Sequence, residues 1–60
     1  MFTNEQKLAC VERELKFRQY VYPRRIETGK MTQKQVDRET ALMEAIVEDY
    51  RKLAASERLL

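Results

Sequence analysis

The sequence predicts an all-α protein, an antiparallel two-helix hairpin that pairs with a second copy to form a four-helix bundle. Glycine and proline each occur once in 60 residues, so few positions interrupt regular structure. Residues with high helix propensity dominate the remainder. Two stretches with helical hydrophobic spacing flank a single turn near Gly29. We therefore expect one domain over residues 1–60.

The first helix is predicted over about residues 3–28. Thr3 and Gln6 fit a capping box, in which each side chain satisfies a backbone N–H at the start of the helix. Pro23 disfavours helical geometry in the residue before it, so we expect a kink or a break at residues 22–23. Gly29 is the expected stop, because glycine enters the left-handed conformation without strain.

The second helix is predicted over about residues 32–55. Thr32 and Gln35 form a second capping box, and Met31 with Val36 fits a hydrophobic staple. The residues that follow the helix, through the C-terminus, are expected to fray. Supporting i,i+4 ion pairs are predicted. They join Glu12 to Lys16, Glu14 to Arg18, and Glu48 to Lys52.

A connection of three residues, 29–31, makes the two helices antiparallel neighbours. One apolar stripe on each helix should form the contact. The first stripe consists of Leu8, Val11, Leu15, Tyr22 and Ile26. The second consists of Val36, Met43, Val47, Tyr50 and Ala54. Pairing about the turn also places Leu15 level with Ile46, and we expect these two to lie near each other across the hairpin.

Apolar residues left outside these stripes predict the dimer. They are Cys10, Phe17 and Val21 on the first helix, and Leu42, Ile46 and Leu53 on the second. One hairpin cannot cover both sets, and so short a chain usually needs a disulfide, a metal or a partner subunit for stability. Twofold pairing is the commonest homo-oligomer. The alternative is a monomeric hairpin that docks its second face onto another protein.

The composition argues against an enzyme, a metal site and a cofactor. There is no histidine to act as a base near neutral pH, and the single cysteine, Cys10, has no histidine to activate it. No glycine-rich phosphate loop is present. Glu44, Glu48 and Asp49 are interpreted as a solvated acidic face. A lone thiol suits a reducing compartment, and neither a signal peptide nor a membrane span is predicted, so we expect a cytoplasmic protein.

Charge is distributed unevenly along the chain. Residues 16–38 carry a net charge of +5, and the remaining residues carry −3. The turn end of the hairpin is therefore basic. Candidate partner-binding residues at this end are Arg18, Tyr20, Arg24, Arg25, Lys30 and Lys34. Three interpretations remain open: a solvated turn, a docking site for an acidic protein, and a nucleic-acid contact using phosphate and stacking interactions.

Two runs, Val21–Thr32 and Met43–Arg51, resemble short uncharacterised helical proteins encoded by phages and prophages of proteobacteria. The resemblance covers most of the chain, from about Leu8 to Arg51. The group has no assigned activity, so it contributes no functional residues. It implies a phage accessory protein, and by analogy one that binds and inhibits or redirects a host protein.

The leading functional hypothesis is a non-enzymatic, homodimeric interaction module that binds and modulates a host or phage protein. The alternative is a small nucleic-acid-binding regulator that uses the basic turn end. An assembly or scaffold component is a third class, without specific support from the residues.

Overall fold

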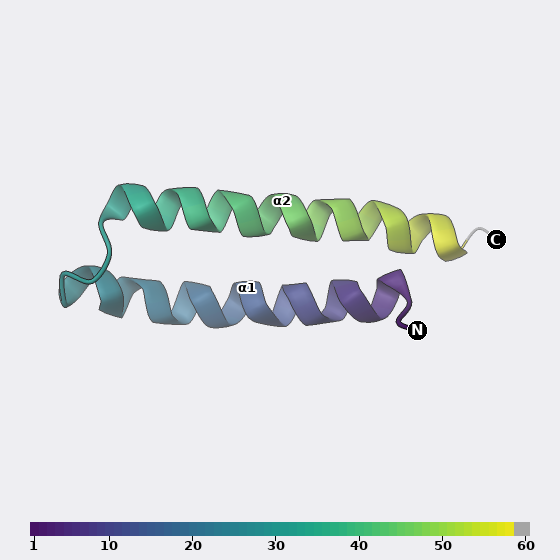
Figure 1. Ribbon diagram of the computed structural model, residues 1–60, viewed down its shortest axis with the longest axis horizontal. Helices are drawn as coiled ribbons and strands as arrows, with labels where there is room; N and C mark the ends of the chain where they lie inside the picture. Colours follow the sequence, from purple (N-terminus) through teal and green to yellow (C-terminus); the bar gives the residue numbers. More distant parts are fainter. Residues whose placement is uncertain (59–60) are drawn as a thin grey trace.

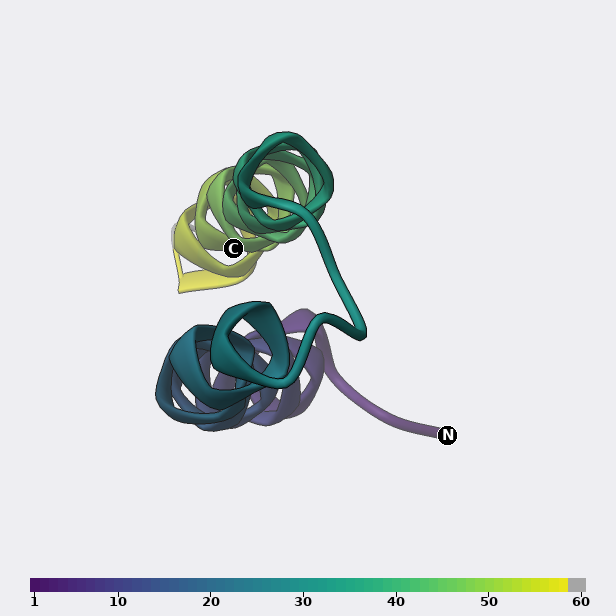
Figure 2. The same ribbon diagram turned by 90° about the vertical axis from the view of Figure 1, so that its left-hand side faces the viewer.

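The computed structural model describes residues 1–58, which contain two helices and no strands. Helix α1 spans Asn4–Glu27 and helix α2 spans Gln33–Arg58. They run antiparallel along their whole length, so the two ends of the chain lie at the same end of the hairpin (Figure 1). Viewed end-on, the molecule is a single layer of two helices (Figure 2). The predicted all-α hairpin is confirmed.

Both helices begin with the predicted capping boxes. In α1, the backbone N–H of Gln6 donates to Thr3 Oγ1 at 3.1 Å, and the N–H of Thr3 donates to Gln6 Oε1 at 2.9 Å. In α2, Gln35 and Thr32 repeat the arrangement at 3.1 and 2.9 Å. Each box satisfies two backbone donors that the helix geometry would leave unpaired.

Helix α1 ends in a Schellman motif at Gly29, as its sequence predicts. Gly29 has a φ of +74°, a left-handed conformation that costs other residues more. The N–H of Lys30 donates to the carbonyl of Arg25 at 2.9 Å, and the N–H of Gly29 donates to the carbonyl of Ile26 at 3.1 Å. The chain thereby reverses direction while the last carbonyls of α1 remain bonded.

Helix α1 continues through Pro23 without a break. We expected either a break or a kink at residues 22–23. The helix is not broken there, and the kink stays a prediction. Proline has no N–H, so the carbonyl of Gln19 lacks its usual helical partner. Both Pro23 and Gln19 are exposed, where water is the ordinary replacement partner.

The core lies between the helices and consists of the predicted stripes. Every member of both stripes is buried or half-buried. The buried members are Tyr22, Val36, Met43, Val47 and Ala54. Four of these five come from α2, so the first stripe is only half covered by its neighbour. A core this small provides limited hydrophobic stabilisation.

Ile46 does not join Leu15 in the core as expected. Its side chain is 40% exposed, whereas Val47, one residue further on, is only 2% exposed. Successive helical residues are rotated by about 100°, so only one of the two can face α1. The correct partner at this level is Val47, and Ile46 belongs to a different face of α2.

Helix α2 extends three residues beyond its expected end at Ala55. The backbone N–H of Asn4 donates to Glu57 Oε1 at 2.8 Å, and Arg58 Nη2 donates to Glu5 Oε1 at 3.2 Å. These contacts hold the last turn of α2 against the first turn of α1. Fraying was also expected of Leu59 and Leu60, which lie outside the described residues.

The core assignment predicts a large loss of stability for Met43→Ala. Removing a buried methionine typically costs about 2–5 kcal/mol, comparable to the total stability of a small domain. We expect thermal unfolding followed by circular dichroism to show a much lower Tm or loss of helicity at 37 °C. The control is Glu44→Ala, an exposed neighbour whose replacement should change stability by no more than about 0.5 kcal/mol. Equal melting of the two variants would contradict the assigned core.

The Schellman motif predicts a smaller effect for Gly29→Ala. No atom lies within 4 Å of the position that a Cβ would occupy, so the cost comes from the positive φ alone. We expect a loss of about 1–2 kcal/mol, because a side chain strains the left-handed conformation. Gly29→Asn should lose less, since asparagine tolerates this conformation better. Urea unfolding of the three proteins measures the difference, and equal stability of all three would count against it.

Candidate functional site: an open apolar face and a basic turn end

Two ion pairs between the helices define which residues lie level with each other. Arg51 Nη2 lies 3.6 Å from Glu12 Oε2, and Arg58 Nη2 lies 3.2 Å from Glu5 Oε1. In both pairs the two residue numbers add to 63. Because each helix rises by the same amount per residue, other pairs with this property are also approximately level.

One broad side of the layer is closed by charged side chains. Arg51 bridges the helices, contacting Glu12 on α1 and, at 3.7 Å, Glu48 on its own helix. A shallow hollow on this side is lined by Leu15, Val47 and Arg51 among others. The participating side chains are about half exposed, so each pair contributes at most about 1 kcal/mol. Their main consequence is a polar surface on this side.

Ion pairs with Arg51, one between the helices and one within α2, replace two of the three predicted pairs. Glu14 and Arg18 do pair, at 3.0 Å. Glu12 and Glu48, however, both contact Arg51, and neither pairs with the lysine four residues along its own helix. Arg51 had no role in the sequence prediction, because its position between two carboxylates depends on the packing of the helices.

The opposite broad side carries the predicted dimer-interface residues. We call these six residues the open face: Cys10, Phe17 and Val21 of α1, with Leu42, Ile46 and Leu53 of α2. Phe17 is 62% exposed, and the three α2 residues are between 40% and 49% exposed. Val21 is half-buried and Cys10 is exposed. The structure therefore leaves this apolar set uncovered by the chain itself.

Residues from both helices border the open face together. A hollow near the turn is lined by Phe17 and Val21 of α1, and by Gln35 and Glu39 of α2. At about 100° per residue, Gln35 lies on the same flank of α2 as Leu42, Ile46 and Leu53. Glu44, Glu48 and Arg51 lie on the other flank by the same geometry. Phe17 and Val21 thus border the same side of the layer as the apolar residues of α2, whereas Cys10 lines a separate hollow formed by α1 and the residues before it.

The open face is arranged in three level pairs. Val21 pairs with Leu42, Phe17 with Ile46, and Cys10 with Leu53, and in each pair the residue numbers add to 63. The α2 members form a narrow stripe about 95° from the centre of the core stripe. On α1, Cys10, Phe17 and Val21 are rotated about the helix axis by about 110–150° from the centre of the α1 core stripe. Each helix of a square four-helix bundle contacts two neighbours at about a right angle, which the α2 stripe matches most closely.

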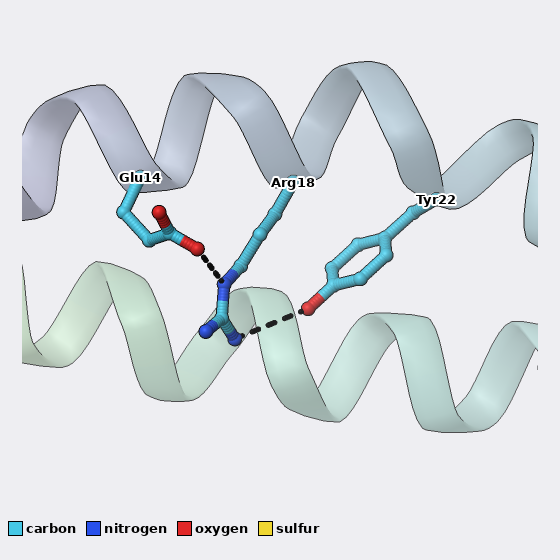
Figure 3. Close-up of polar contacts among 3 residues, drawn as sticks. All are labelled: Glu14, Arg18 and Tyr22. Carbon is cyan, nitrogen blue, oxygen red and sulfur yellow. Dashed lines mark hydrogen bonds and ion pairs between the residues drawn. The ribbon is translucent and has the colours of Figure 1, made fainter.

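Arg18 connects the open face to the turn end. Its Nε donates to Glu14 Oε1 at 3.0 Å, and its Nη1 lies 3.5 Å from the hydroxyl oxygen of Tyr22 (Figure 3). The hydrogen bond to Glu14, followed by the one to Tyr22, raises the pKa of Arg18 above its ordinary value. The guanidinium is therefore charged at every working pH, and these contacts orient it across the space between the helices.

The other predicted partner-binding residues surround the turn end. Tyr20 is 78% exposed, and Arg24, Arg25, Lys30 and Lys34 are also exposed. None of these four basic side chains forms an ion pair within residues 1–58. Four charges without internal partners leave this end strongly basic. Tyr22, in contrast, is buried and belongs to the core.

Groups that could perform metal or thiol chemistry are not brought together. In the part of the chain that the structure describes, no three His, Cys, Asp or Glu side chains are grouped so as to hold a metal ion. Cys10 is an exposed free thiol beside Phe2, Lys7 and Arg13. The candidate site consists of the open face and the basic turn end.

No protein-family model, curated protein or solved structure matches this chain. Neither α1 nor α2, as far as they are described, contains a stretch long and apolar enough to cross a membrane.

Proposed function

We propose that this protein is a non-enzymatic interaction module. In this proposal two hairpins pair through their open faces to form a four-helix bundle, and the basic turn ends bind an acidic surface of another protein. The observation that carries the proposal is the set of exposed large apolar side chains, Phe17, Leu42, Ile46 and Leu53, on a hairpin with a very small core. Exposed apolar patches of this kind mark interaction sites.

The size of the broad side that carries the open face supports a second copy as its occupant. The whole hairpin measures 47 Å by 16 Å. A pairing that covered this side from end to end would use an outline of about 750 Å², close to the roughly 800 Å² of surface that each partner contributes to a standard stable interface. A second layer would also cover the half-buried α1 stripe residues at their edges, which the single layer leaves in contact with water.

The basic turn end supports binding of an acidic partner protein. Exposed tyrosine and arginine are the residues that most often dominate interface energetics, and Tyr20 and Arg24 provide both. Unpaired positive charges also accelerate encounter with an acidic surface. The resemblance to phage-encoded proteins implies a host or phage protein as the partner, and modulation of that protein as the outcome.

Replacing Leu42 by Glu should disrupt the proposed dimer. A buried carboxylate at the centre of an apolar interface is unpaired and strongly unfavourable. We expect light scattering coupled to size exclusion to give the mass of two chains for wild type and of one chain for the variant. The control is Ala41→Glu, which adds the same charge at an exposed position about 120° round α2 from the open-face stripe, in the hollow with Glu44 and Arg51, and should remain dimeric. A monomeric wild type at high concentration would refute the dimer and favour a hairpin that docks onto another protein.

Replacing both Arg24 and Arg25 by Ala should abolish partner binding while preserving the fold. Exposed substitutions usually change stability by no more than about 0.5 kcal/mol, so the helical circular dichroism should be retained. Affinity purification from the natural host should recover an acidic protein with wild type and lose it with the double variant. Lys7→Ala with Arg13→Ala removes the same charge near the open end and should retain the partner.

The same variants test the nucleic-acid alternative. A protein that binds through phosphates loses affinity steeply as salt rises, with a slope proportional to the number of contacts. Tight binding of DNA or RNA by wild type at physiological salt, with a shallower slope in the double variant, would replace the protein partner by a nucleic acid. Full activity of the double variant in both assays would leave the open face as the working surface.

A further inference from the structure

We infer that the two copies pair antiparallel, so that the dimer is a rod with one basic turn end at each pole. This inference rests on the proposed dimer and specifies its geometry. Two hairpins can pair face to face in two ways that preserve twofold symmetry. The twofold axis lies in the interface and runs either along the helices or across them.

The apolar pattern is compatible with a second copy in both orientations. On α1, Cys10 and Val21 lie at equal distances from the middle of the helix, which is between Leu15 and Lys16. On α2, Leu42 and Leu53 are centred at the same level, between Val47 and Glu48. Reversal thus exchanges the two outer members of each stripe, as pairing between identical surfaces requires, and places Phe17 and Ile46 close to the centre.

In the antiparallel orientation, each helix packs against its own counterpart in the partner. Leu42 then lies opposite the partner's Leu53, and Val21 lies opposite the partner's Cys10. The two Ile46 side chains flank the twofold axis, as do the two Phe17 side chains. In the parallel orientation, α1 packs against α2 of the other copy, and the level pairs of the open face contact each other. Apolar contacts alone therefore do not select one arrangement.

Charge selects the antiparallel arrangement. By the register above, residues 39–47 lie level with residues 16–24, so the turn half of the hairpin, residues 16–47, carries +3 and the other half carries −1. Parallel pairing would bring two halves of +3 together at one end of the bundle. Arg25 and Lys30 border the hollow on the open face, so some of these charges would lie directly at the interface. Antiparallel pairing instead places each half of +3 beside a half of the other copy that carries −1. Opposite potentials across an interface fix its orientation, and like charges suppress the alternative.

This arrangement makes the dimer bivalent. The turn ends, with Tyr20, Arg24 and Arg25, lie at opposite poles and face away from each other. Each end can engage an acidic surface without obstructing the other, because the hairpin is 47 Å long. One dimer would therefore link two copies of its partner or two sites on an assembly, with the avidity that two linked contacts provide.

The orientation can be measured by double electron–electron resonance between spin labels. The labelled protein carries Cys10→Ser to remove the native thiol and Glu27→Cys at the exposed turn end. Antiparallel pairing separates the two labelled backbones by about 35 Å along the rod, from the helical rise of 1.5 Å per residue. Parallel pairing leaves them separated by little more than one helix-packing distance, about 10 Å.

A sample that mixes two differently labelled proteins provides a second, complementary distance. Cys10→Ser with Ser56→Cys places a label at the open end, and equal amounts of the two labelled proteins are combined. Antiparallel pairing then brings the unlike labels together, whereas parallel pairing keeps them at opposite ends. Circular dichroism and light scattering establish beforehand that each variant folds as wild type does.

Long distances between Glu27→Cys labels together with short ones in the mixed sample support the antiparallel dimer. Short distances between Glu27→Cys labels in a protein with the mass of two chains overturn the orientation and leave the dimer standing. A mass of one chain with no dipolar coupling overturns the dimer itself, and the orientation with it.

Discussion

A single layer of two helices can cover only the strip of surface between them, and every other feature of this protein depends on that constraint. Each helix buries one flank against its neighbour, which leaves two broad sides in contact with water (Figure 2). Among residues 1–58 five side chains are buried, and four of them belong to α2. Such a core contributes little hydrophobic free energy compared with the conformational entropy lost on folding. The proposed dimer would add burial from a second chain.

The two broad sides differ in the side chains that they expose to water. On one side, Arg51 bridges Glu12 and Glu48, and the surface is polar enough to remain solvated. On the other side, Phe17 and Ile46 lie level with each other and are exposed. The proposed function uses this difference between the two sides, because it assigns association to the apolar side.

Charge adds a direction to this association. The turn end carries exposed arginine and lysine side chains without internal partners, while Arg18, slightly further from the turn, is held by Glu14 and Tyr22 (Figure 3). Apolar contacts are not directional, so they permit several pairings. In the proposed dimer, electrostatic repulsion between the basic ends would reduce the number of permitted pairings and leave these ends available for an acidic partner.

Local signals in the sequence were sufficient to determine the helices and the turn. The capping boxes at Thr3 and Thr32 and the left-handed Gly29 are predictable because each involves residues only a few positions apart. Periodicity likewise predicted both core stripes. Only the structure decided that α1 continues through Pro23, that Ile46 does not join Leu15 in the core, and that Glu12 contacts Arg51 of α2. The last two depend on how far each helix is rotated about its axis when the two pack, a quantity that residue spacing within one helix does not contain.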